Sequence, residues 1–131
     1  MQLNDGEKIL GAVYNTSNSL RISVDYISEG KAAYPENCFF ITDKRIIFAV
    51  TNFSRDELGE KSSEEVLELS KVTCDIHLAD ISKINVLSFY KSVIFKTKDG
   101  KTSKYNYITK ESIELMKSIF EKYLPGKLSL A

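Results

Sequence analysis

The sequence is poor in the residues that most often carry catalysis or bind metals. It has one histidine, His77, two cysteines and no tryptophan among 131 residues. A single histidine argues against a catalytic triad, and the glycines are too scattered to form a phosphate-binding loop. Cys74 and His77 share the Cys-x-x-His spacing of metal sites, but a strand points residues three apart to opposite faces, and structural zinc takes four ligands. We therefore expect no catalytic residue, no metal site and no cofactor.

An excess of charge of one sign is also missing. Eighteen basic residues balance eighteen acidic ones, which argues against a nucleic-acid partner, because such proteins normally present a strongly basic face. No apolar run approaches the ~18 residues of a membrane-spanning helix, and the first residues lack the pattern of a signal peptide. We therefore expect a cytoplasmic protein in which Cys38 and Cys74 are reduced and mostly buried.

Strand signals cover most of the chain. Its length predicts one domain over residues 1–131. Two nearly continuous apolar segments, 37–42 and 45–51, flank a short polar centre and predict a hairpin that is covered on both faces. Further strands are predicted, several from apolar residues at every second position, over residues 7–14, 20–27, 72–78, 83–89, 92–98 and 101–108.

The period changes near the C-terminus. Thr109 is a good N-cap, and apolar residues follow it at spacings of three and four, which is typical of one buried helix face. These residues are Ile113, Met116, Ile119, Phe120 and Tyr123. Pro125-Gly126 predicts the end of the helix. The order of about eight strands and then one helix predicts a mainly β (α+β) fold, an antiparallel barrel or strongly bent sheet capped by the helix.

An acidic insertion interrupts the strand pattern at about residues 53–71. Six acids stand between residues 55 and 70 against only Arg55 and Lys61. Gly59 and two adjacent serines add signals for irregular structure. We interpret this segment as a mobile loop that ends in an extended arm or a short helix.

Several short motifs in order suggest a family. Asn-Asp-Gly-Glu-Lys-Ile-Leu stands near the start, Phe-Ile-Thr-Asp-Lys-Arg-Ile-Ile-Phe in the middle, and Leu-Ala-Asp-Ile-Ser-Lys-Ile-Asn-Val after the insertion. With Val-Ile-Phe-Lys-Thr-Lys-Asp-Gly-Lys and the final helix, the chain resembles the bacterial pleckstrin-homology-like domains and the related GRAM domains. The resemblance covers residues 3–124 apart from 15–35 and 53–71, and Thr42 with Arg45 and Asp80-Ile81 are its most characteristic points.

The resemblance implies a partly open barrel of two roughly orthogonal antiparallel sheets, closed at one end by the helix. Such domains are rarely enzymes; they bind phosphoinositides, other lipids or proteins, or they assemble with themselves. The chain departs from phosphoinositide readers in two ways. Its first turn, residues 15–19, lacks the converging Lys and Arg residues that a multiply charged headgroup needs, with only Arg21 beyond it. Its terminal helix also lacks the usual tryptophan.

Lysines gather around the second predicted hairpin. Residues 91–131 hold nine lysines and four acids, and we take Lys91, Lys96, Lys98 and Lys104 as a possible docking surface, with Lys101 nearby. The ordinary interpretation is a solvated sheet face on which lysines guard an exposed strand. The functional prediction is a non-enzymatic interaction module that binds a protein partner or assembles with itself.

Two other functions stay open. One is peripheral attachment to an anionic membrane through the lysine-rich hairpin. The other is a small barrel that holds an apolar ligand, lined by Phe89, Tyr90, Phe95, Tyr105 and Tyr107. Aromatic residues in a sheet more often pack in the core and across strands.

The register of the second hairpin decides where its lysines point. A two-residue loop, Asp99-Gly100, would mix lysines and aromatics on one face, whereas a three-residue loop, residues 98–100, separates them. Because burial favours separation, we predict the three-residue loop, with Gly100 at positive φ and Lys96, Lys98 and Lys104 facing outward.

Overall fold

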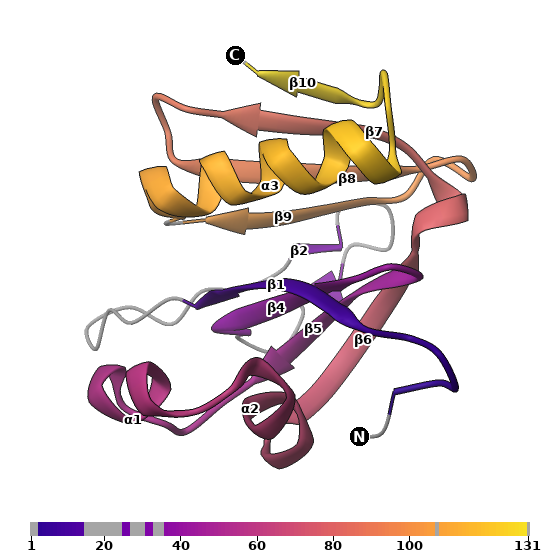
Figure 1. The fold of residues 1–131 in the computed structure, drawn as a ribbon. Helices are drawn as coiled ribbons and strands as arrows, with labels where there is room; N and C mark the ends of the chain where they lie inside the picture. Colours follow the sequence, from indigo (N-terminus) through magenta and orange to yellow (C-terminus); the bar gives the residue numbers. More distant parts are fainter. Residues whose placement is uncertain (1–2, 15–24, 27–30, 33–35, 107, 131) are drawn as a thin grey trace.

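The chain folds into two mostly antiparallel sheets and one long C-terminal helix (Figure 1). The computed structural model describes residues 3–14, 25–26, 31–32, 36–106 and 108–130. The first sheet has the order β1 (Ile9–Tyr14), β4 (Cys38–Thr42), β5 (Arg45–Val50) and β6 (Lys71–His77). The second has the order β10 (Leu128–Leu130), β7 (Ile81–Leu87), β8 (Ser92–Thr97), β9 (Thr102–Asn106), β2 (Asp25–Tyr26) and β3 (Lys31–Ala32). Within these ranges the strands form two sheets rather than one closed barrel, so the predicted α+β class is confirmed.

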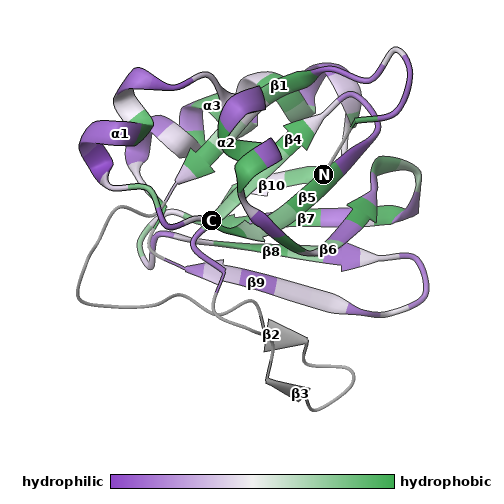
Figure 2. Cartoon of the chain, turned by 90° about the horizontal axis from the view of Figure 1, so that it is seen from below, coloured by the Kyte–Doolittle hydropathy of each residue, from purple (hydrophilic) through white to green (hydrophobic). Residues whose placement is uncertain are grey.

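The hairpin of β4 and β5 is covered on both faces, as the sequence predicted. All its residues from Cys38 to Ala49 are buried except Asp43 and Lys44 in the turn. Phe39, Ile41, Ile46 and Phe48 face the core between the sheets, whereas Cys38, Phe40, Ile47 and Ala49 face a second apolar cluster. Figure 2 shows the resulting green of β4 and β5. Both faces are covered because helices pack on the side away from the second sheet.

Those helices correct the prediction for residues 53–71. The segment forms α1 (Arg55–Glu60) and α2 (Ser63–Leu69), where a loop with at most one short helix was expected. Ser54 and Ser62 cap the helices by accepting hydrogen bonds from backbone N–H groups three residues ahead. Buried Leu58, Val66 and Leu67 join the second apolar cluster. These caps and apolar anchors explain why an acidic segment folds onto the sheet, and its mobility stays a prediction.

The helix α3 (Lys110–Tyr123) lies beside both sheets and seals the core, as predicted. Thr109 accepts a hydrogen bond from the Ser112 N–H and caps the helix. Ile113, Met116, Ile119 and Phe120 are buried in the core. A Cβ atom at Gly11 of β1 would lie 2.9 Å from side-chain atoms of Ile119 and Leu115. Glycine therefore allows β1 to run close beneath the helix.

The chain does not end with this helix, contrary to the predicted order. After Pro125 and Gly126, which has φ 80°, it forms β10 parallel to β7, with Leu128 opposite Ile84. Among the strand pairs of the described residues, this one is parallel and the others are antiparallel. Three residues are too few to show a strand period in the sequence. Within the part of the chain that the structure describes, no helix is long and apolar enough to cross a membrane.

The two cysteines lie on opposite faces of the first sheet. Cys38 is fully buried in the cluster under α1 and α2, and Cys74 is half-buried against the core. Burial, helped by Glu36 near Cys38 and Asp75 near Cys74, raises the pKa of each thiol to about 12. Cys38 therefore matches the predicted burial, and Cys74 is more exposed than predicted.

We expect both thiols to be unreactive in the folded protein, because thiolate is the reactive form and little is present near neutral pH. An aromatic disulfide reagent at pH 7.5 should modify Cys38 only on unfolding and Cys74 slowly. The Cys74→Ser variant isolates Cys38 for the measurement. Rapid modification of that variant in the absence of denaturant would contradict the burial of Cys38.

Candidate interaction surface

The hairpin of β8 and β9 has the predicted three-residue loop. Phe95 pairs with Ser103 and Lys96 with Thr102, and the Thr97 N–H donates to the Lys101 carbonyl at 2.9 Å. Gly100 has φ 89°, a conformation that favours glycine. The Asp99 carboxylate accepts a hydrogen bond from the Thr97 hydroxyl. This hydrogen bond lowers the pKa of Asp99. It also joins the loop to the end of β8.

This register places the aromatic residues inside and the lysines outside, as predicted. Val93, Phe95 and Tyr105 are buried, whereas Lys96 and Lys98 are exposed and Lys104 is half-buried. Tyr107, expected on the inner face, lies outside the described residues. The inner residues contact the core that α3 seals, so the lysines face away from α3.

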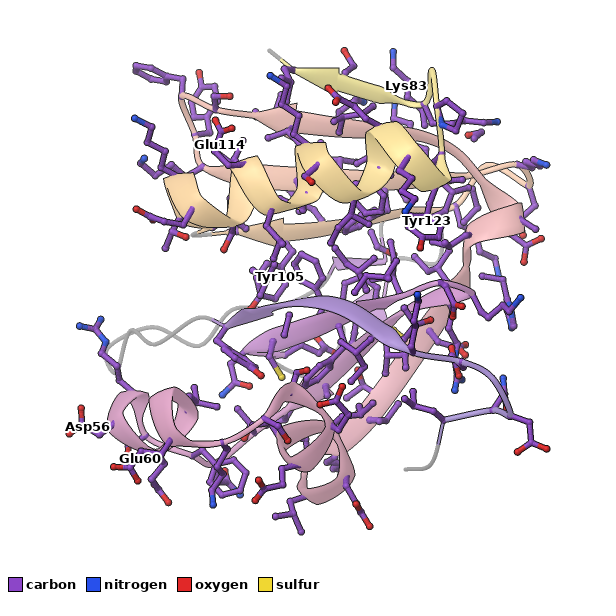
Figure 3. The ribbon with its side chains drawn as sticks, in the orientation of Figure 1. Asp56, Glu60, Lys83, Tyr105, Glu114 and Tyr123 are labelled. Atoms are coloured by element: carbon purple, nitrogen blue, oxygen red, sulfur yellow. The ribbon has the colours of Figure 1, made fainter. Side chains whose placement is uncertain are left out.

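The neighbouring strand adds Lys83, which sequence reasoning missed. Lys83 of β7 stands directly opposite Lys96 of β8, and directly opposed residues share one face. A register irregularity between Ile81 and Lys83 sets this pairing. Figure 3 labels Lys83 near the top of the view, where β7 lies beside the edge strand β10. We name the set formed by Lys83, Lys96, Lys98 and Lys104 the lysine face.

Lys91 does not belong to the lysine face, which corrects the predicted set. It lies in the turn before β8, with φ 51°, and its carbonyl accepts a hydrogen bond from the Ile108 N–H. Lys96 and Lys98 lie near the other end of β8. At ~3.3 Å per residue, Lys91 and Lys96 are separated by roughly 17 Å along the strand. Lys91 was grouped with Lys96 and Lys98 because it is near them in the sequence, but the extended strand separates it from them.

Two exposed aromatic residues, Phe89 and Tyr90, directly precede Lys91. Phe89 is 87% exposed and Tyr90 is 73% exposed, and their rings pack edge to face at 5.2 Å. In contrast, Phe95 and Tyr105 are buried in the core, where the Tyr105 and Phe39 ring centroids are 4.8 Å apart. The core-packing interpretation is therefore confirmed for Phe95 and Tyr105 and wrong for the pair in the turn.

An acidic surface covers the outer side of the first sheet. Its members are the exposed acids of α1 and α2, which we name the acidic face: Asp56, Glu57, Glu60, Glu64, Glu65 and Glu68. Figure 1 shows these helices on the side of the first sheet that faces away from the second, and Figure 3 labels Asp56 and Glu60 there. The lysine face and the acidic face are thus the outer faces of two different sheets.

Buried charges join the start of the chain to the first hairpin. Glu7 Oε2 accepts hydrogen bonds from Thr42 Oγ1 at 2.6 Å and from Arg45 Nε at 3.0 Å, and Glu7 Oε1 accepts from Arg45 Nη2 at 3.1 Å. Arg45 Nη1 also donates to Asp75 Oδ2 at 2.8 Å. Burial acts to raise the pKa of Glu7, but hydrogen bonds from Arg45, Thr42 and the Asn4 N–H outweigh it and hold the pKa at about 2.

This network is structural. Each carboxylate oxygen of Glu7 accepts two hydrogen bonds from the protein itself. The turn before it, residues 4–7, closes through a bond from the Glu7 N–H to the Asn4 carbonyl at 3.0 Å, with Gly6 at φ 76°. The Asn-Asp-Gly-Glu and Ile-Thr-Asp-Lys-Arg motifs are therefore two halves of one buried contact.

His77 and Cys74 have different surroundings. His77 is exposed at the end of β6 and pairs in register with Arg45, whereas Cys74 packs against the core. In the described ranges, no group of three or more potential ligands is close enough to hold a metal ion. The interpretation of His77 as a polar strand residue agrees with its exposure.

Comparison with known proteins identifies the fold family. No curated protein matches the chain. The family described as Bacterial PH domain matches residues 3–122, a range that contains the Glu7 turn, both hairpins and nearly all of α3. Domains of this kind are generally non-enzymatic binding modules. With the match covering most of its length, the chain belongs to the bacterial PH domain family.

Proposed function

We propose that this protein is a non-enzymatic interaction module whose lysine face binds an acidic surface of a protein. The observation that carries the proposal is the pairing of Lys83 with Lys96 across β7 and β8. Like charges directly opposite each other destabilise a sheet. An acidic partner would neutralise this repulsion, whereas a face that serves only solubility gains nothing from opposed lysines.

The surroundings of the pair support the same function. None of the ion pairs among the described residues involves Lys83, Lys96, Lys98 or Lys104. Half-buried Ile94 lies between Asn85 and Lys104 on the same face and supplies apolar area at its centre. The Lys98 N–H donates to the Asp80 carbonyl at 2.8 Å, so the loop is fixed to the corner between the sheets. Because the backbone of this loop is already fixed, binding orders side chains there rather than backbone.

The test is binding of a glutamate-rich peptide, with a glutamine-rich peptide of equal length as the neutral probe. We expect Lys83→Glu/Lys96→Glu/Lys98→Glu, three exposed positions, to lose at least tenfold in affinity by fluorescence anisotropy, while the urea midpoint stays nearly unchanged, as for most surface substitutions. Wild-type binding should weaken steeply with salt, because exposed charges are screened over ~10 Å at 0.1 M.

The matched control reverses three exposed lysines of α3, Lys110, Lys117 and Lys122, which gives the same change in net charge. This variant should bind the acidic peptide more weakly by less than threefold. Equal losses in the two variants would show a response to overall charge and would contradict a specific lysine face.

A second candidate, attachment to an anionic membrane, is favoured by the exposed pair Phe89 and Tyr90 next to Lys91. Aromatic rings at the membrane interface and a nearby cation are typical of peripheral attachment. Flotation with vesicles that contain 30% anionic lipid separates the two functions. Binding that is lost in Phe89→Ser/Tyr90→Ser but kept in the triple lysine variant would support the membrane; no flotation of wild type would exclude it.

A further inference from the structure

We propose that the partner of the lysine face is a second copy of this chain, which presents its acidic face. The inference rests on the proposed function, that the lysine face binds protein, and names the occupant. Successive copies then associate head to tail, α1 and α2 of one copy on β7, β8 and β9 of the next.

The acidic face is a built surface. Leu58, Val66 and Leu67 anchor α1 and α2 on the first sheet, and serine caps fix both helix starts. Two of its six acids make a cap or an ion pair, because Glu57 completes the capping box of α1 and Glu65 lies 3.9 Å from Lys61; Glu64 also accepts a hydrogen bond from the Ser63 hydroxyl at 3.4 Å. For the other four, Asp56, Glu60, Glu64 and Glu68, no ion pair is found among the residues that the structure describes.

The two faces complement each other in charge. The acidic face has six acids with Arg55 and Lys61 beside them, and the lysine face has four lysines, of which Lys104 pairs in register with Asp25. The whole chain has a net charge of zero, so copies experience no overall repulsion as they approach. Proteins with net charge near zero associate more readily than charged ones, and here the charges are sorted onto separate faces.

Each face also has an apolar residue among its charges. Leu69 at the end of α2 is 66% exposed, and Ile94 is half-buried among the lysines. An apolar contact ringed by charged groups is the usual arrangement of a protein interface. The charges of the rim would set register and association rate, and the apolar contact would add affinity.

The contact is heterologous, because it joins two different faces of the same chain. The faces belong to different sheets, so a copy bound at one face leaves the other free. Heterologous contacts build rings if the rotation closes and open filaments if it does not. The assembly should therefore grow beyond a dimer as concentration rises.

Charge exchange between two variants tests the inference. In the first, the exposed Lys83, Lys96 and Lys98 become Glu; in the second, Asp56, Glu60 and Glu68 become Lys, which leaves both helix caps intact. By sedimentation velocity at 50 mM salt, wild type should associate with rising concentration. Each variant alone should be monomeric, and an equimolar mixture should associate again. Carbodiimide cross-linking of wild type should join peptides of α1 or α2 to peptides of β7 to β9.

The α3 variant, with Lys110, Lys117 and Lys122 changed to Glu, controls for net charge. It carries the charge of the first variant but keeps both faces, so it should still associate. A monomeric wild type, association of either face variant alone, or cross-links confined to other segments would overturn the inference. If wild type is monomeric yet binds the glutamate-rich peptide through the lysine face, the proposed function stands and only self-association fails; if it does neither, both fail.

Discussion

Phe120→Ala should lower the free energy of unfolding by about 3–5 kcal/mol, as large-to-small changes of buried aromatic residues do. Phe120 is fully buried, and its ring packs edge to face on Phe95 with 6.4 Å between centroids. The substitution removes the side chain that joins α3 to β8, and the backbone of β1 beneath the helix cannot move in to fill the space without disturbing its own sheet. The urea midpoint measures the loss, at salt high enough to suppress association.

Glu121→Ala is the matched control, because Glu121 follows Phe120 on α3 and is exposed. It should shift stability by no more than ~0.5 kcal/mol. A loss below ~1 kcal/mol for Phe120→Ala would show that α3 is not docked on the sheets. The slope of the unfolding free energy against urea should stay constant in both variants, since neither changes the surface exposed on unfolding.

Local signals predicted the elements that local chemistry controls. Thr109, the apolar spacing after it and Pro125 define α3, and Gly100 defines the loop of the β8–β9 hairpin, because caps and left-handed turns depend on neighbouring residues. Burial on both sides of β4 and β5 also followed from their unbroken apolar sequence.

The same kind of signal was present in the acidic insertion and was missed. Ser54 with Glu57 and Ser62 with Glu65 both have the capping-box spacing, and Leu58, Val66 and Leu67 give the apolar side of the helices. The density of acids suggested a solvated loop. A helix with one apolar side packs on a sheet even when its other side is highly charged.

The candidate site depends on contacts that a linear sequence does not contain. Lys83 reaches Lys96 only through the register of β7 against β8, including its irregularity after Ile81. Lys91 is near Lys96 in sequence, but the length of β8 separates them. The lysine-rich segment was therefore predictable, whereas its division into a lysine face and an aromatic turn was not.

The contact between Glu7 and Arg45 shows the same dependence at the centre of the fold. Thirty-eight residues separate the two side chains, and their Nε to Oε2 distance is 3.0 Å. Arg45 and Thr42 belong to the hairpin motif and Glu7 to the N-terminal one, so two motifs that are distant in the sequence meet in one buried contact. Arginine suits this position because its planar fork binds both carboxylate oxygens at once.

Glu7→Gln should cost about 3–5 kcal/mol near pH 7, because removing one partner of a buried ion pair leaves the other charge poorly compensated. Asp75 remains at 2.8 Å from Arg45, but its side chain is 34% exposed and bonds a different guanidinium nitrogen. The neutral side-chain amide would also place an NH2 group where a carboxylate oxygen of Glu7 accepts hydrogen bonds, so that donors would face one another. Chemical unfolding at pH 7 measures the loss, and Glu114→Gln, an exposed acid on α3 that Figure 3 labels, should change stability by no more than ~0.5 kcal/mol.

The pH dependence of the unfolding free energy separates the contribution of the Glu7 charge from that of its side-chain packing. Its pKa is about 2 in the folded protein against an ordinary value of 4.5, so between these values the unfolded chain binds more protons. The stabilisation that ionised Glu7 contributes is therefore fully present above pH 4.5 and is lost as the pH falls through 2. At 1.36 kcal/mol per pKa unit, it amounts to about 3 kcal/mol. Wild type and Glu7→Gln should differ most above pH 5 and converge toward pH 2, while Glu114→Gln should follow wild type throughout. A constant gap between wild type and Glu7→Gln would mean that the packing of the side chain, and not its charge, stabilises the first hairpin.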